Sequence, residues 1–361
     1  MHCTKKDELL LLMTYSGSGM RKKLAEELYG RYGAKVIDEF IADKLVTTKK
    51  TKPRIVVLTQ KGYEYIKGSE YSFSAMVMLD NNEGGRKRFN TSTKGDANRI
   101  SGISDIIASC RLAGVNTYIE ERGVTNDWEN EEIAFYTSRE LKVFIDSKSQ
   151  FASGSYCHGS LKIKDNIYHM YHLENEDISF VREVEKNYKE AVAKEMNIKK
   201  SGIIVFDFGY AGIEKILQND YIEKLKEKKY YGVTAPVTNR ITSTIDYDSK
   251  YYVPSGKEGT IYLKAIINES DTKGLIKYIS SENRISTGGI SGLGYSEEDR
   301  EIVNMFPINM ATMSRLNKSK NKYSVIALES AVPELKKIYS NVDIKWITIP
   351  DEQLIDYFEE E

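Results

Sequence analysis

The stretch 5-KKDELLLLMTYSGSG-19 decides how the amino-terminal region folds. Its apolar run, residues 9–13, is followed by two serines and two glycines, which predicts a helix over residues 5–15. Apolar residues at helical spacing then predict a second helix over residues 20–29 and a third over residues 34–45. Gly30 and Gly33 indicate a tight link between those two helices.

Strand signals follow the third predicted helix. Residues 45–48 and 55–59 are rich in β-branched side chains, and a basic tip separates them, which predicts a hairpin. Three helices and a hairpin within about 60 residues are typical of a winged helix, with the third helix in the position of a recognition helix. The sequence therefore predicts a winged-helix domain over residues 1–66 and double-stranded DNA as its partner.

Eight basic residues of this domain are the candidate DNA contacts. We expect them to neutralise phosphates and position the duplex rather than to read bases. They are Arg21, Lys22, Lys23, Lys35, Lys49, Lys50, Lys52 and Arg54. A second interpretation stays open, because winged helices also serve as protein-protein modules. Asp38, Glu39 and Asp43 on the predicted third helix would disfavour its deep insertion between phosphates.

Composition limits the classes of protein. The 361 residues suit a winged helix (1–66), a linker (67–98) and an α/β body (99–361) with a sizeable core. The 52 basic and 53 acidic residues give a net charge of −1, so nucleic-acid binding would depend on local patches. Three cysteines without paired spacing are typical of the reducing cytoplasm, and no apolar run approaches the ~20 residues that span a membrane. We expect a cytoplasmic protein with no membrane partner.

Strand and helix signals intermix after the winged helix. The linker contains a strand-like run at residues 73–79. Strands are predicted at residues 133–136, 141–145, 202–208, 231–233, 261–266, 323–328 and 344–347, with a hairpin at 159–163 and 167–173. Helices are predicted at residues 99–112, 178–196, 211–219, 221–228 and 332–339. This alternation indicates a mixed α/β fold with a mixed sheet.

The layout resembles the replication-relaxation family, which includes plasmid-mobilisation relaxases of the MobC type. The resemblance rests on the amino-terminal winged helix, on Arg99 to Gly114 after a basic linker, and on the hairpin sequence GSLKIKDNIYHMYHL. It continues in Val184-Glu185-Lys186, in Gly202-Ile203-Ile204-Val205, in Tyr251-Tyr252-Val253-Pro254 and in GTIYLK from Gly259. It implies a body related to the restriction-endonuclease fold, acting on plasmid or transposon DNA together with other transfer or replication proteins.

Nucleases of that fold hold a divalent cation with carboxylates, while a nearby lysine steadies the attacking water or the developing charge. Asp146-Ser147-Lys148, directly after a predicted strand, is the candidate acidic-x-lysine triplet. Glu120 is the candidate partner carboxylate, with Glu121 and Glu132 as alternatives. The expected metal is Mg²⁺ or Mn²⁺. A solvated turn is the competing interpretation of the triplet, because such triplets arise readily in a chain with 29% charged residues.

Other catalytic patterns are weaker. Cys157 and His158 could form a nucleophile pair, but His169 and His172 differ by three positions and would point to opposite faces of a strand. Tyrosines on predicted strands (Tyr168, Tyr171, Tyr251, Tyr252) could act as nucleophiles, although strand aromatics usually pack. The glycine-rich residues 286–294 lack the Lys-Ser/Thr of a phosphate loop, so no nucleotide is expected.

Two hypotheses follow from different classes. In the first, the chain is a DNA-binding protein of a plasmid or integrative element that acts in replication or mobilisation, and its body either nicks origin DNA with a metal or presents that DNA to another enzyme. In the second, it is a non-catalytic winged-helix regulator whose body forms a homodimer or binds a ligand. Metal dependence that maps to Asp146 and Lys148 would separate them.

Overall fold

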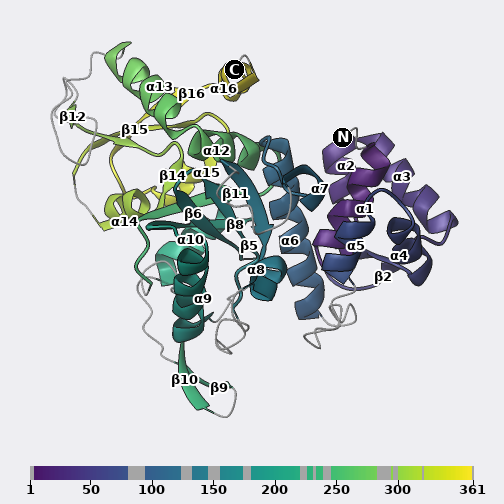
Figure 1. The fold of residues 1–361 in the computed structure, drawn as a ribbon. Helices are drawn as coiled ribbons and strands as arrows, with labels where there is room; N and C mark the ends of the chain where they lie inside the picture. The colour runs from purple at the N-terminus through teal and green to yellow at the C-terminus, as the bar shows by residue number, and fades with distance from the viewer. Residues whose placement is uncertain are drawn as a thin grey trace. The chain divides into compact units, whose positions relative to one another are not determined.

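The computed structural model describes residues 4–79, 94–122, 132–144, 155–173, 180–219, 226–230, 233–238, 245–282, 294–295, 300–318 and 321–359. The chain divides into two compact units. Unit 1 contains Met1–Glu176 and Glu183–Ser201, and unit 2 contains Asp177–Arg182 and Gly202–Glu361. Both combine helices with sheets, so the predicted α/β class is confirmed (Figure 1).

Unit 1 begins with helices and a small sheet. The elements are α1 (Lys5–Tyr15), β1 (Gly19–Arg21), α2 (Leu24–Tyr29), α3 (Arg31–Ala42), β2 (Val46–Lys49), β3 (Ile55–Leu58) and α4 (Gln60–Lys67). A capping box between Thr4 and Asp7 starts α1. The strands form an antiparallel sheet in the order β1-β3-β2. The predicted first helix is confirmed, but the predicted second helix begins later, because residues 19–21 pair with β3 as a strand.

The α2–α3 pair depends on a close approach of two backbones. A Cβ atom on Gly33 would lie 1.8 Å from the carbonyl oxygen of Ala25, so α3 packs against α2 at a position that only glycine accommodates. Val36, Ile37 and Phe40 bury the inner face of α3, and Arg31, Tyr32 and Lys35 remain exposed. The third predicted helix is therefore amphipathic, as its spacing indicates.

Two helices follow α4, and both begin inside the segment predicted as a linker, residues 67–98. They are α5 (Ser72–Leu79) and α6 (Lys94–Leu112). The predicted strand at residues 73–79 is wrong, because this apolar run is a helix that packs against α1, with the Tyr15 and Ser74 hydroxyls 2.7 Å apart. Helix α6 packs against α1, β1 and β3, and Figure 1 shows it running beside the amino-terminal helices.

The second sheet region of unit 1 is antiparallel. Its elements are α7 (Ile119–Arg122), β4 (Ile133–Thr137), α8 (Ser138–Phe144), β5 (Gly159–Ile163), β6 (Asn166–His172) and α9 (Arg182–Glu195). The β5–β6 hairpin is confirmed, and β5 also pairs with β4. The predicted strand at residues 141–145 is wrong. The side chains of Thr137 and Glu140 accept from each other's backbone amides, at 3.3 and 2.9 Å, in a capping box that starts α8 instead.

Unit 2 contains a mixed sheet region and an antiparallel ribbon. Strand β8 (Lys200–Asp207) pairs in parallel with β11 (Ser249–Pro254), which pairs antiparallel with β14 (Ile308–Asn309). The ribbon has the order β7-β10-β9, with β7 (Phe180–Val181), β9 (Lys226–Tyr230) and β10 (Val233–Thr238). The helix predicted at residues 221–228 is wrong at its end, because residues 226–228 belong to β9.

A further sheet of unit 2 has the order β12-β13-β15-β16. Its strands are β12 (Gly294–Tyr295), β13 (Glu301–Asn304), β15 (Tyr323–Leu328) and β16 (Ile344–Ile349). The helices are α10 (Ala211–Asn219), α12 (Lys257–Ile267), α13 (Glu269–Glu282), α14 (Met310–Lys318), α15 (Val332–Ile338) and α16 (Asp351–Glu359). The predicted strands β15 and β16 are confirmed. The predicted strand at 261–266 is wrong, because it lies inside α12, where Ile261, Leu263 and Ile266 are buried.

Candidate nucleic-acid interface

One end of the β1-β3-β2 sheet collects most of the predicted DNA contacts. Arg21 in β1 and Lys49 in β2 are both register partners of Ile55, the first residue of β3. The turn after β1 therefore lies at the same end as the β2–β3 connection, and the Lys22 amide donates to the Arg54 carbonyl at 3.0 Å. We call Lys49, Lys50, Lys52 and Arg54 the basic tip.

The basic tip is open to solvent. Lys50, Lys52 and Arg54 are exposed and Lys49 is half-buried, and Lys23 is exposed at the same end of the sheet. Across the described ranges, none of these five side chains forms an ion pair with a carboxylate. Their charge is therefore available to an anionic partner in solution.

Two other predicted contacts already have acidic neighbours on α3. The Lys22 ammonium lies 3.9 Å from the carboxylate of Asp38, and the Lys35 ammonium lies 3.9 Å from that of Glu39. Glu39 also accepts a 2.7 Å hydrogen bond from Lys6, which, with the charge of Lys6, lowers the Glu39 pKa. Exposed pairs of this kind are weak, so a phosphate can replace the carboxylate. The acidic face of α3 nevertheless reduces the field that Lys22 and Lys35 present.

Arg21 is held inside unit 1. Its guanidinium donates to Glu27 at 2.7 Å and to the buried carboxylate of Asp105 in α6 at 2.9 Å, and its side chain is 14% exposed. Burial raises the pKa of Asp105 to about 6, although the charge of Arg21 opposes that rise. Arg21 thus joins β1 to α6, and we leave it out of the interface.

The hairpin that carries the basic tip is fixed at its other end. All four residues of β3 are buried, and the Thr59 side chain caps α4 by accepting from the Gly62 amide at 3.1 Å. The Thr59 hydroxyl also donates to the Leu45 carbonyl at 3.0 Å, which joins the start of α4 to the base of β2. The basic tip therefore extends from a rigid base.

Of the three predicted catalytic residues, the structure describes Glu120. Asp146 and Lys148 lie outside the described residues. Glu120 accepts hydrogen bonds from the Ser74 amide at 3.0 Å and the Ser74 hydroxyl at 2.6 Å, one on each carboxylate oxygen. Glu120 therefore joins α7 to α5. Among the described residues, no group of three or more His, Cys, Asp or Glu side chains could hold a metal.

The histidines of the β5–β6 region are buried. As expected from strand alternation, His169 and His172 face different helices. The His169 Nδ1 lies 3.0 Å from the Ser160 hydroxyl and its ring packs edge-on against Tyr188 of α9, while His172 lies 3.9 Å from Asp105 of α6. Burial lowers the pKa of both imidazoles to about 3, so both are neutral near pH 7 and the contact with Asp105 is not an ion pair.

Cys157 does not fit the nucleophile that its neighbour His158 suggested. The thiol is buried and donates to the Gly159 carbonyl at 3.0 Å. Burial raises the Cys157 pKa to about 12, which disfavours the reactive thiolate. Burial also lowers the pKa of His158 well below its usual value. Both residues therefore belong to the core of unit 1.

A buried carboxylate with no role in the sequence analysis lies at the end of β8 in unit 2. Asp207 is buried at the carboxyl end of β8, the edge where open α/β sheets commonly bind ligands. One oxygen of Asp207 accepts from the Phe208 amide at 2.9 Å, and the other lies 4.0 Å from the Lys215 ammonium. A Cβ on Gly212 would lie 2.7 Å from Asp207 and from the Tyr252 hydroxyl, so the space beside the carboxylate is filled. We interpret Asp207 as structural.

The comparisons with known proteins add no family to this picture. No protein-family model, curated protein or solved structure matches the chain. Within the described residues, every helix is too short or too polar to cross a membrane.

Proposed function

We propose that the amino-terminal part of unit 1 is a winged-helix module that binds double-stranded DNA through the basic tip and Lys23. The observation that carries the proposal is the gathering of five basic side chains, all without a carboxylate partner among the described residues, at one end of one sheet. Lysines and arginines of this kind neutralise phosphates and release counterions, whatever the base sequence.

The order of the elements supports the winged-helix assignment. The chain runs α1-β1-α2-α3-β2-β3, and the strands pair in the order β1-β3-β2. In this arrangement α3 would be the recognition helix and the β2–β3 connection would be the wing. The exposed acids Asp38 and Glu39 on α3 favour contacts by the wing over deep insertion of α3 into the major groove.

The resemblance to the replication-relaxation family is the sole basis for the biological process that we propose. It favours a protein of a plasmid or integrative element that binds origin DNA in replication or mobilisation. Nicking with Mg²⁺ or Mn²⁺ stays a prediction, because its two principal residues, Asp146 and Lys148, lie outside the described residues. The alternative, a non-catalytic regulator, requires the same DNA surface and differs in the body.

Fluorescence anisotropy with a labelled random-sequence duplex tests the binding. We expect a Lys49→Ala, Lys50→Ala, Lys52→Ala variant to bind about tenfold or more weakly. The slope of log K against log salt should fall by about 0.9 for each phosphate that the variant no longer neutralises. The matched control is Lys273→Ala, Lys336→Ala, Lys337→Ala, which removes three exposed lysines of unit 2. Equal affinity of the tip variant and the wild type would contradict the proposal.

A nicking assay on supercoiled DNA of the parent element distinguishes a relaxase-like enzyme from a non-catalytic regulator. Metal-dependent nicking at one site, abolished in Asp146→Ala, would support a relaxase-like enzyme. Duplex binding that depends on the basic tip, without nicking in either metal, would favour the regulator.

A further inference from the structure

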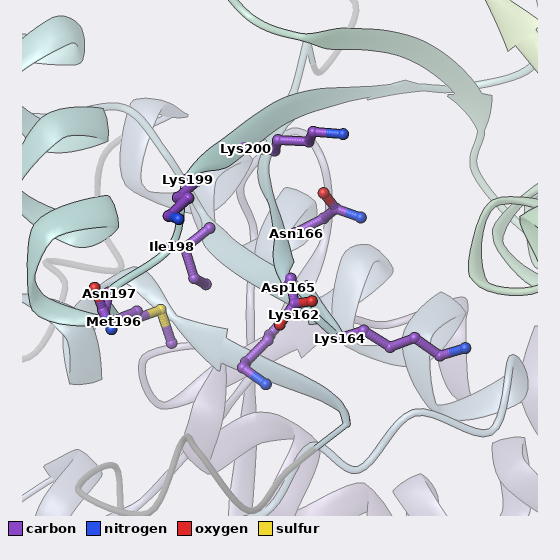
Figure 2. Close-up of a pocket in the computed structure, with 9 residues that line it drawn as sticks. All are labelled: Lys162, Lys164, Asp165, Asn166, Met196, Asn197, Ile198, Lys199 and Lys200. Carbon is purple, nitrogen blue, oxygen red and sulfur yellow. The ribbon is translucent and has the colours of Figure 1, made fainter.

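A pocket of about 630 Å³ opens where three segments of unit 1 meet. The β5–β6 turn, the end of α9 and the first residue of β8 form its walls, as Figure 2 shows. Four of the lining side chains are lysines: Lys162, Lys164, Lys199 and Lys200. The sequence analysis assigned no role to any of them.

The pocket carries an excess of positive charge. Asp165 is the one carboxylate among the lining residues, all of which lie in the described part of the chain, so lysines outnumber acids by three. The amide side chains of Asn166 and Asn197 add neutral hydrogen-bond donors. In Figure 2, Lys164, Asn166 and Lys200 extend toward the same side of the pocket.

One of the four lysines is buried and three are at the surface. Lys162 is 7% exposed, whereas Lys164, Lys199 and Lys200 are exposed at the rim. An ammonium in a region of low dielectric constant attracts an anion more strongly than one in bulk water. The lining side chains include no aromatic ring on which a nucleobase could stack. The pocket therefore suits an anionic group rather than a base.

The backbone around the pocket is held in place before any ligand binds. The Ile198 amide donates to the Ala193 carbonyl at 2.8 Å across the end of α9, where Asn197 has a φ of 50°. On the opposite wall, the Lys164 amide donates to the Glu132 carbonyl at 2.6 Å. Such preorganisation reduces the entropy lost on binding.

We propose that this pocket binds a phosphate group. Phosphate carries one to two negative charges at neutral pH and accepts hydrogen bonds from ammonium groups, which matches a pocket lined by four lysines and one carboxylate. The phosphate can belong to a free polyphosphate or to a nucleic-acid backbone. The site is separate from the basic tip. Asp105 contacts both Arg21, at the basic-tip end of β1, and His172, and His172 lies at the opposite end of β6 from Asn166 at the pocket, roughly 20 Å away.

Calorimetric titration of the full-length protein with tripolyphosphate tests the proposal. We expect Lys164→Gln, Lys199→Gln, Lys200→Gln to weaken binding by at least about tenfold, because three charges leave the rim. The control, Lys273→Gln, Lys336→Gln, Lys337→Gln, should bind as the wild type does. The proposal is overturned if the wild type does not bind tripolyphosphate, or if both variants lose affinity equally.

Competition with a 20-base-pair duplex distinguishes the two sources of phosphate. It is done with the basic-tip alanine variant, so that the tip contributes nothing. Displacement of tripolyphosphate by the duplex assigns the pocket to a nucleic-acid backbone, whereas tripolyphosphate that stays bound assigns it to a small phosphate compound. Failure of duplex binding at the tip leaves the pocket result intact, so this proposal and the proposed function can fail separately.

Discussion

Unit 1 contains two antiparallel hairpins with lysines near their connections, β2–β3 and β5–β6, and they use those lysines differently. The connection of β2 and β3 is solvent-exposed, and its basic tip has no acidic partner among the described residues. The β5–β6 turn lies beside the end of α9, and its lysines line a pocket. The strands differ as well, because every residue of β5 is buried, whereas Thr47 and Thr48 of β2 are exposed.

The difference shows how context changes the effect of similar charges. Lysines on an exposed tip produce a long-range, salt-sensitive field that suits an extended polyanion. Lysines around a pocket with fixed walls favour a small group of defined shape. In the β5–β6 hairpin both strands are largely buried, whereas in the β2–β3 hairpin only β3 is fully buried, and three predictions address this contrast.

The largest expected effect is acid destabilisation that originates in the β5–β6 hairpin. The pKa values of His169 and His172 are lowered by burial to about 3, from 6.5 in the unfolded chain. Their contribution to stability is complete above about pH 6.5 and disappears as the pH falls toward 3, because the unfolded state binds protons first. Asp105 acts in the opposite sense, since its raised pKa of about 6 gives a contribution that disappears as the pH rises through 6.

We therefore expect the free energy of unfolding to fall by on the order of 3 kcal/mol between about pH 6.5 and about pH 4.5, with the histidines outweighing Asp105. Urea titrations at several pH values measure it. Asp105→Asn removes the opposing contribution and should make the acid slope steeper. A flat pH profile would show that the histidines are not buried as neutral rings.

A smaller effect is expected at Glu185, the α9 carboxylate that anchors the β5–β6 region. It accepts from the Ser155 hydroxyl at 2.6 Å, the Tyr156 amide at 2.7 Å and the Tyr171 hydroxyl at 2.7 Å. Because Glu185→Ala leaves these donors without an acceptor, we expect a loss of about 2 kcal/mol in urea unfolding. The control is Glu190→Ala on the exposed side of α9. A loss of equal size in both variants would contradict an anchoring role.

The smallest effect is expected at the basic tip. The Lys49→Ala, Lys50→Ala, Lys52→Ala variant should change the free energy of unfolding by no more than about 0.5 kcal/mol, because these side chains are at the surface. Val57→Ala in the same hairpin removes a side chain that is 4% exposed and should cost about 1 to 2 kcal/mol. Unfolding curves of the two variants measure the contrast. A large loss in the lysine variant would mean that the tip supports the fold.

Much of the secondary structure follows from local patterns. Helix α1 and the β5–β6 hairpin match their predictions closely, because an isolated apolar run or two alternating runs around a turn leave few options. The three wrongly predicted strands are short apolar runs, at residues 73–79, 141–145 and 261–266, which are helical in their described parts. Such runs suit a buried helix as well as a strand. For 141–145 the sequence contains a usable signal, the Thr137-x-x-Glu140 capping box.

The candidate sites were less predictable than the fold. The exposed basic tip was visible in the sequence, because a lysine cluster between two strands has no apolar face to bury. The retention of Arg21 by Asp105 was not visible, since 84 residues separate the two. The phosphate pocket was also hidden, because Lys162 and Lys200 come from different segments that meet only at the end of the hairpin.

Local sequence patterns were sufficient for the α/β class, the first helix, both hairpins of unit 1 and the exposed basic tip. These features depend on periodicity, capping and turn residues, which act over a few neighbouring positions. Tertiary packing was needed to establish which cations are neutralised, which histidines are buried and which lysines share a pocket. The physical reason is that pairing and desolvation depend on distances between groups that the chain brings together from remote positions.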